Sequence, residues 1–217
     1  IGSMKNWGYE ISANAWAVRT NDFTWLIDAN ITLPDNKVLS LVDDADIVGE
    51  YRIIRVNEPI YSLYGYKYWG VNEANGNPVY YKADGETLVQ LNFPANAVYL
   101  FDPDNPSEMT TTSTFGAADK MIVGQTHPKF FGGLNSKMTY KNFDLNIMLR
   151  YSAGNYVMNR TRVDLLNLAF TNNSTEILNR WQSASEPGDG WVPRLSYGGQ
   201  NFTYKPETTN SMFVEKG

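Results

Sequence analysis

The chain has 217 residues, a formal charge of −5 at neutral pH, 14% aromatic residues and no cysteine. This length allows one large domain or two small ones with a sizeable core. The acidic balance, with a pI near 4.9 and no basic run, argues against a nucleic-acid binder. The lack of cysteine excludes disulfide scaffolds, cysteine nucleophiles and Cys-ligated metals.

An alternating pattern begins near the start of the chain. Apolar and polar residues alternate along 7–17 and again along 23–33. A period of two is typical of strands, not helices. The connection "RTND" between the two runs is short and polar, as in a hairpin. We therefore expect residues 7–33 to form one hairpin with strands of about ten residues.

The same pattern returns in residues 129–153. In "KNFDLNIMLRYSAGN" every odd position from Phe143 to Tyr151 is apolar, while Asp144 and Arg150 are among the residues between them. The one residue out of step is Met148. The stretch predicts a second hairpin whose strands have one apolar and one polar face.

The turn of this second hairpin is predicted at Lys141 and Asn142. A two-residue turn there pairs Tyr140 directly with Phe143, because the residues that flank such a turn lie opposite each other. Both residues then fall on the face that is apolar in each strand. The pairing set by the turn therefore agrees with the alternation of apolar residues along both strands.

A long connection, about residues 34–127, separates the hairpins and has a different composition. It contains the turn signals Asn75-Gly76 and Asp84-Gly85 and an aromatic cluster, "YSLYGYKYWG". We expect it to form an extended loop region with turns at these positions.

A second long connection, about residues 154–210, follows the second hairpin. Within it "RTRVDLLNLAF" and "STEILNRWQ" predict short helices, the latter with Ser174 or Thr175 as its N-cap. A further strand is expected to begin near Met212.

The connections alternate between short and long, which distinguishes two classes of β protein. Soluble sandwiches and barrels space their strands evenly. Outer-membrane barrels have short turns on one side and long loops on the other, and strands of about ten residues cross the hydrocarbon layer. A soluble antiparallel sheet with one solvated face gives the same alternation, so this alternative stays open.

On the barrel interpretation the apolar face lies in lipid and the polar face looks into the barrel. Charges such as Asp28 and Arg150 then meet water, whereas each would cost about 2 to 4 kcal/mol near the lipid midplane. Aromatic residues near the strand ends form the interfacial girdles. These residues are Trp7, Phe23, Trp25, Tyr140, Phe143 and Tyr151.

Four segments occur in an order that resembles a known family. They are "GSMKNWGYE", "EPIYSLYGYKYWGV", "HPKFFGGLNSKMTYKNFDLNIMLRYSAGN" and "NSMFVEKG". Together they resemble the C-terminal barrel part of SusC/RagA-type TonB-dependent outer-membrane transporters of the Bacteroidetes. The resemblance covers nearly the whole chain.

The resemblance implies an all-β fold, a sector of a 22-stranded antiparallel transmembrane β-barrel with long extracellular loops that carry short helices. It implies an outer-membrane importer of oligosaccharides or oligopeptides that is energised through TonB and works with a SusD-like surface lipoprotein. No enzymatic activity and no cofactor are expected. The chain shows no TonB box, plug domain or final strands, and open strand edges are costly in lipid. We therefore expect it to be one sector of a longer polypeptide.

No catalytic constellation emerges from the residues. The single histidine, His127, precedes a proline and is expected at a loop end. Asp102, Asp104 and Glu108 are weak candidates for a structural calcium ion, because oxygen-rich loops suit a hard cation, but their spacing is not that of an EF-hand. Solvated turn residues are the alternative.

Loop aromatics are the best candidates for contact with a substrate or a partner, since flat rings with polar rims suit sugars and peptide side chains. The alternative is that these rings pack the loops together or against the lipoprotein. The candidates are Tyr64, Tyr66, Tyr68, Trp69, Trp181, Trp191 and Tyr197.

Two other classes of function stay open on the residues alone: a soluble secreted carbohydrate-binding β module, and a cell-surface adhesin or structural β protein. Detergent dependence would separate the transporter from both. A screen for glycan or peptide binding would separate the last two.

Overall fold

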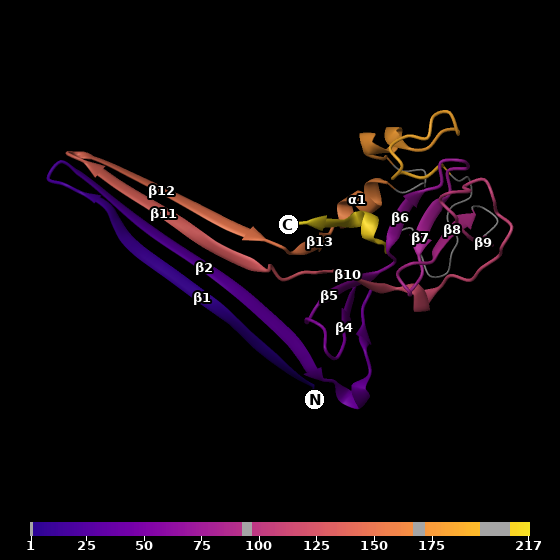
Figure 1. The fold of residues 1–217 in the computed structure, drawn as a ribbon, viewed down its shortest axis with the longest axis horizontal. Helices are drawn as coiled ribbons and strands as arrows, with labels where there is room; N and C mark the ends of the chain where they lie inside the picture. The colour runs from indigo at the N-terminus through magenta and orange to yellow at the C-terminus, as the bar shows by residue number, and fades with distance from the viewer. Residues whose placement is uncertain (1, 93–96, 167–171, 196–208) are drawn as a thin grey trace.

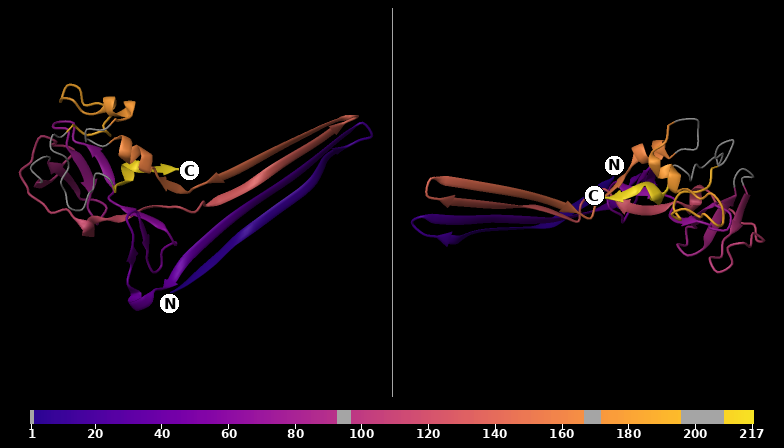
Figure 2. Two further views of the ribbon diagram at one scale, coloured as in Figure 1. Left: turned by 180° about the vertical axis from the view of Figure 1, so that it is seen from behind. Right: turned by 90° about the horizontal axis from the view of Figure 1, so that it is seen from above.

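The computed structural model describes residues 2–92, 97–166, 172–195 and 209–217. Four long antiparallel strands form one sheet, which projects as an arm from a body built by the two long connections (Figures 1 and 2). The turns of both hairpins lie at the free tip of the arm (Figure 1). In sheet order the strands are β1 (Ser3–Arg19), β2 (Phe23–Ser40), β11 (Phe130–Tyr140) and β12 (Phe143–Ala153).

The register of the arm follows from the predicted turn. Tyr140 lies opposite Phe143, which confirms the expected pairing. Lys141, the first residue of the turn, has a φ of 53°, the left-handed conformation that tight hairpin turns require. Both pairings of β11, with β2 and with β12, run without a shift of register.

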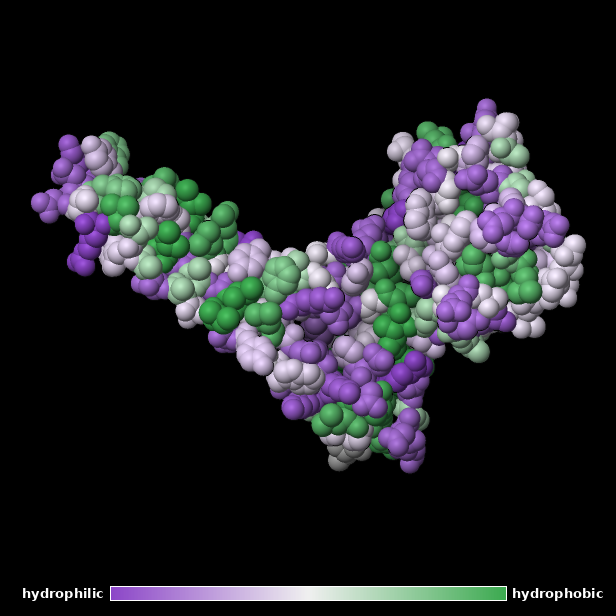
Figure 3. Space-filling model, in the orientation of Figure 1, coloured by the Kyte–Doolittle hydropathy of each residue, from purple (hydrophilic) through white to green (hydrophobic). Residues whose placement is uncertain are grey.

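This register separates the two faces of the arm. One row across the four strands joins Ala13, Ala29, Leu134 and Leu149, so the apolar side chains share a face. The next row joins Asn14, Asp28, Asn135 and Met148 on the other face, where the Asn14 amide donates to the Asp28 carboxylate. Met148 is therefore the apolar exception in a polar row. In Figure 3 hydrophobic surface lies along the arm, and hydrophilic surface gathers at the tip.

The first hairpin is longer than residues 7–33, because β2 continues through Pro34 to Ser40. Beyond Thr32 only β1 is paired with β2 along the arm, and a proline is tolerated where a strand has one neighbour. Gly8 lies opposite Pro34, and a Cβ there would stand 2.7 Å from the Leu33 carbonyl oxygen. Glycine thus permits the close approach of the two strands.

The first connection folds into two small sheets. The expected turns at Asn75-Gly76 and Asp84-Gly85 are confirmed, with φ values of 76° at Gly76 and 78° at Gly85. The expectation of an extended loop was incomplete, because eight short strands lie here. One sheet, in order β10-β5-β4-β3, has β3 (Ile47–Val48), β4 (Arg52–Ile54), β5 (Ser62–Gly65) and β10 (Met121–Gln125). The other, β6-β7-β8-β9, has β6 (Tyr68–Val71), β7 (Pro78–Tyr81), β8 (Leu88–Asn92) and β9 (Ala97–Leu100). Two 3-10 turns, η1 (Val42–Asp44) and η2 (Ala117–Asp119), complete this connection.

The second connection carries the expected short helices. Ser174 is the N-cap of the second one, but that element is a 3-10 helix and the Ser174 side chain makes no capping bond. The α-helix ends at Leu165, and part of the longer helix expected from the sequence lies outside the described residues. The elements are β13 (Tyr156–Met158), α1 (Arg160–Leu165), η3 (Thr175–Asn179), η4 (Ser211–Phe213) and β14 (Val214–Lys216), which pairs with β13.

Among the described residues, no helix has the length and apolar character needed to cross a membrane.

The hydrophobic core lies in the body. Its main cluster is aromatic and connects the β6-β7-β8-β9 sheet to the segment before β10. A smaller cluster joins α1 to η4. The main cluster consists of Tyr66, Tyr68, Tyr80, Val89, Leu91 and Phe115, and the smaller one of Val163, Leu166 and Phe213.

One contact joins three strands of the arm. The Tyr151 hydroxyl on β12 crosses β11 and donates to the Asn30 carbonyl of β2 at 2.8 Å. It can do so because Gly132 lies beneath it, where a Cβ would stand 2.5 Å from that hydroxyl oxygen and 2.7 Å from Cζ. The neighbouring Gly133 has more room, since its nearest contact would be the Leu149 carbonyl at 3.5 Å.

We predict that Gly132→Ala destabilises the intact protein by about 1 to 3 kcal/mol, because the new methyl group meets both the Asn30 carbonyl oxygen and the Tyr151 hydroxyl that donates to it, which displaces the ring and overpacks the strand. Gly133→Ala is the matched control and is expected to be neutral or stabilising by less than about 1 kcal/mol. Thermal unfolding of the two variants measures the difference. Equal midpoints would show that the Tyr151 contact does not hold the strands.

Candidate functional site

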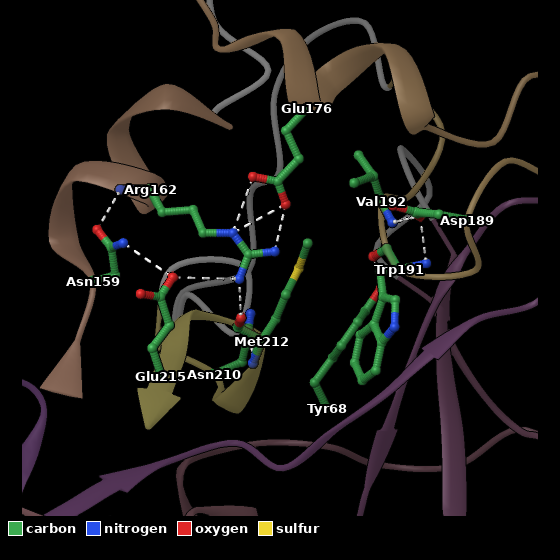
Figure 4. Close-up of polar contacts among 10 residues, drawn as sticks. All are labelled: Tyr68, Asn159, Arg162, Glu176, Asp189, Trp191, Val192, Asn210, Met212 and Glu215. Carbon is green, nitrogen blue, oxygen red and sulfur yellow. Dashed lines mark hydrogen bonds and ion pairs between the residues drawn. The ribbon is translucent and has the colours of Figure 1, made fainter. Parts of the chain in front are cut away.

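Tyr68 and Trp191 pack their rings against each other in the body (Figure 4). Tyr68 is buried on β6, and its hydroxyl donates to the Trp191 carbonyl at 2.7 Å. Their rings lie 5.7 Å apart, and the Trp191 side chain remains 49% exposed. Burial, and then the charge of Asp189, raise the pKa of Tyr68 well above its usual value. The phenol is therefore a fixed neutral donor beneath an exposed indole.

The segment that carries Trp191 is held in a tight turn. The Asp189 carboxylate accepts the backbone N–H groups of Trp191 at 2.8 Å and Val192 at 3.0 Å (Figure 4). Gly190 has a φ of 76°, and its carbonyl accepts the N–H of Val71 at 3.0 Å. The second connection is thereby fixed along β6.

Trp181 joins the two connections. Its indole N–H donates to the Glu73 carbonyl at 2.8 Å, and its backbone N–H donates to the Val192 carbonyl at 2.9 Å. The ring lies against Gly76, where a Cβ would stand 2.5 Å from a ring carbon. Glycine at this turn therefore serves both the backbone conformation and the contact with the ring.

The other predicted aromatics lie in different surroundings. Tyr66 is fully buried in the core, and Tyr64 is partly buried beside the Arg55 guanidinium, 5.6 Å from its ring centroid. Trp69 is partly buried, with its ring 5.3 Å from that of Phe101. Tyr197 lies outside the described residues. Of the candidates described, Trp191 is the one exposed by more than a third of its surface.

The calcium candidates lie in an exposed turn. The Asp102 carboxylate accepts from the backbone N–H of Asp104 at 3.0 Å and from the Asn105 amide at 2.9 Å. These bonds, that of Asn105 above all, lower the pKa of Asp102. Over the described ranges no group of three or more His, Cys, Asp or Glu side chains is placed to hold a metal ion. The calcium site thus stays a sequence prediction.

Arg162 is a polar centre that sequence reasoning missed. Its guanidinium forms an ion pair with Glu176 of η3, with Nε 3.0 Å from each carboxylate oxygen, and donates to the Met212 carbonyl at 2.6 Å (Figure 4). The hydrogen bond to Glu176 is the main cause of its raised pKa. Asn159 caps α1 by accepting the Arg162 N–H at 2.9 Å and donates to Glu215 at 3.0 Å. One side chain thus ties together α1, η3 and the η4–β14 segment.

No clear sequence signal marks this centre. The helix has only six residues, so Arg162 lies in its last turn as well as near its start, and a cation in the last turn is favourable beside the helix dipole. The sequence does not show that Glu176 is the partner.

Comparisons with known proteins cover both the arm and the body. No protein-family model matches the chain. It is 31% identical over 204 residues to the TonB-dependent receptor P3 of Formosa agariphila, a match that covers 89% of this chain and 19% of that protein. It is 33% identical over 164 residues to the TonB-dependent receptor SusC of Bacteroides thetaiotaomicron, covering 72% of this chain and 15% of that protein. The chain thus spans 15% to 19% of the length of these two curated relatives.

A solved structure of the RagAB peptide transporter superposes with a TM-score of 0.73 at 21% sequence identity and covers 99% of this chain and 21% of that one. The chain belongs to the SusC/RagA type of TonB-dependent receptors. A second structure, the RagAB peptide importer in the "open-open" state, gives a TM-score of 0.71 at 19% identity. The four-stranded arm of this SusC/RagA-type chain is therefore a sector of a transporter barrel, and the all-β fold expected from the sequence is confirmed.

We predict that Arg162→Met lowers the free energy of local opening of α1 and β14 by about 1 to 3 kcal/mol, because Glu176 loses its charged partner. Arg160→Met is the matched control. The Arg160 side chain is 55% exposed in its ion pairs with Glu50 and Asp164, and we expect a loss below about 1 kcal/mol. Hydrogen exchange followed by mass spectrometry measures both, and equal protection in the two variants would contradict a central role for Arg162.

Proposed function

We propose that this chain is part of an outer-membrane TonB-dependent active transporter that imports oligosaccharides or oligopeptides together with a SusD-like surface lipoprotein. The observation that carries the proposal is the arm. From Tyr9 to the tip, its register puts most apolar side chains on one face and the charged ones on the other, over strands long enough to cross a hydrocarbon layer.

The positions of the connections support an orientation in the membrane. Both hairpin turns lie at the tip of the arm, and both long connections fold at the other end (Figure 1). Short turns on the periplasmic side and long loops outside are typical of outer-membrane barrels. On this proposal the regions of about residues 34–127 and 154–210 lie outside the cell, and the plug and remaining strands belong to other parts of a longer polypeptide.

The relatives support a transport role and leave the substrate class open. The relatives are named as receptors, and the solved structures as a peptide transporter or importer. A non-enzymatic role of this chain is consistent with these names. The peptide transporter shares the fold at 21% identity, which supports oligopeptides as one class of substrate to test. The likeness to SusC and to RagAB supports pairing with a SusD-like lipoprotein as part of the proposal.

Within the body, Trp191 is proposed as the main contact with substrate or lipoprotein, and Trp69 as a second. Trp191 presents an exposed indole on a rigid support made by Tyr68 and Asp189. A preorganised aromatic ring loses little conformational freedom on binding. Tyr66 and Tyr68 act by packing the core that positions this surface.

Uptake of labelled oligopeptides and oligosaccharides by cells that make the intact transporter tests the proposal. We expect uptake of one class, and its loss when a protonophore or removal of TonB abolishes energy coupling. Trp191→Ala is expected to reduce uptake about two- to tenfold, because a single aromatic contact contributes about 0.5 to 1.5 kcal/mol.

Leu178→Ala is the control for this substitution, since Leu178 is also an exposed apolar residue of the second connection. Uptake that persists without energy coupling would contradict active transport. Unchanged uptake by Trp191→Ala would remove this residue from the proposed contact surface without affecting the transport assignment.

A further inference from the structure

Two lysines lie side by side at the end of the apolar face nearest the body. Lys5 of β1 pairs directly with Lys37 of β2, and the unbroken register places both on the face of Trp7 and Tyr9. The Lys5 ammonium lies 5.4 Å from the centroid of the Trp7 ring, as expected for neighbours on one face. Like charges directly opposite each other on paired strands are destabilising. None of the ion pairs among the described residues involves either lysine.

The position of this pair along the strand is that of a membrane boundary. Lys5 lies one rung beyond Trp7, about 7 Å further along the strand at the usual rise per residue. Apolar residues occupy the rungs on the other side of Trp7, from Tyr9 onward. Interfacial tryptophans sit at the level of lipid headgroups, and lysine side chains beyond them reach the charged groups of the lipid.

A groove lies beside Trp7, the aromatic neighbour of Lys5 on this face. The pairing of β11 with β2 ends where Phe131 meets Thr32, and the chain before β11 then diverges from β2. The opening has a volume of about 450 Å³. One wall carries Trp7, Tyr9 and Leu33, and the other carries His127, Pro128 and Lys129.

The groove combines apolar walls with a third cation, Lys129. The groove also contains the carboxylate of Asp35. This residue lies opposite Trp7, and its carboxylate accepts the Asn36 N–H at 2.8 Å. Lys129 and Asp35 line the groove itself, and Lys5 and Lys37 lie on the same face one rung beyond Trp7 and Asp35. These three lysines contrast with the formal charge of −5 of the whole chain.

We propose that Lys5 and Lys37 bind the phosphate of an anionic membrane lipid, with an acyl chain of that lipid against Tyr9 and Leu33. A phosphate between the two ammonium groups removes their repulsion, and the apolar rungs below favour a lipid over a soluble anion or an acidic protein. The inference rests on the proposed placement of the arm in the outer membrane.

Lipid retention by the intact transporter in nanodiscs tests the inference. The discs contain phosphatidylglycerol and phosphatidylcholine, and native mass spectrometry measures which lipid remains bound. The double variant Lys5→Gln/Lys37→Gln is expected to lose phosphatidylglycerol retention about 10- to 30-fold, since each lysine near an anionic surface strengthens binding about fivefold. Phosphatidylcholine retention is expected to stay unchanged.

Lys141→Gln is the matched control. Lys141 also lies over an aromatic ring, that of Tyr140 at 5.5 Å, but at the opposite end of the arm. This variant is expected to retain phosphatidylglycerol like the unmodified protein. Equal retention in all three proteins would overturn the inference, and displacement of the lipid by excess inorganic phosphate would show a general anion site instead of a lipid site.

Insertion into the nanodiscs, followed separately by heat-modifiable migration on gels, distinguishes the two proposals. Failure of the unmodified protein to insert would contradict the proposed function. Normal insertion without dependence on the lysines would contradict the lipid site alone.

Discussion

The arm depends on one constraint, the register that keeps a period of two across four strands. It runs without a shift in both pairings of β11 and from Met4 to Trp16 in the pairing of β1 with β2. A slip by one residue would turn every apolar side chain to the polar face. Two contacts in the arm oppose such a slip. The tight turn at Lys141 aligns Tyr140 with Phe143, and Tyr151 crosses Gly132 to reach the Asn30 carbonyl. Because both hairpins turn at the same tip, the same register sends both long connections to the other end, where they fold as one body.

Different interactions stabilise the arm and the body. The arm has no packed core, and its strands are held by backbone hydrogen bonds within the sheet, the arrangement that a closed barrel continues on both sides in lipid. The body has an aromatic core and the Arg162 centre. The two parts meet where β2 ends: Val38 donates to the Glu58 carbonyl at 3.0 Å, and its own carbonyl accepts from Asn57 at 2.8 Å. A strand that carries part of the apolar face thus also anchors the first connection.

The sequence predicted the arm well and the body poorly, for physical reasons. A long strand with one apolar face repeats the same signal over many residues, so both hairpins and the pairing at Tyr140 could be inferred. The strands of the body are short, and residues such as Val79 and Tyr80 are buried in succession, which removes the alternation. Turn residues such as Gly76 were recognisable because their conformation is local. The pairing of Arg162 with Glu176 depends on the tertiary fold, and an aromatic-rich segment does not reveal which rings are buried.

The central claim is that the two faces of the arm meet lipid and water respectively, and quenching of a fluorescent label tests it most directly. Labels would be attached to single cysteines at Ile147 and at its neighbour Asn146 in the intact transporter, reconstituted in vesicles. These residues pair with Ser136 and Lys137 on opposite faces of the sheet. The account predicts that a lipid-soluble quencher acts on position 147 and a water-soluble quencher on position 146. Equal access of the water-soluble quencher to both positions would contradict it.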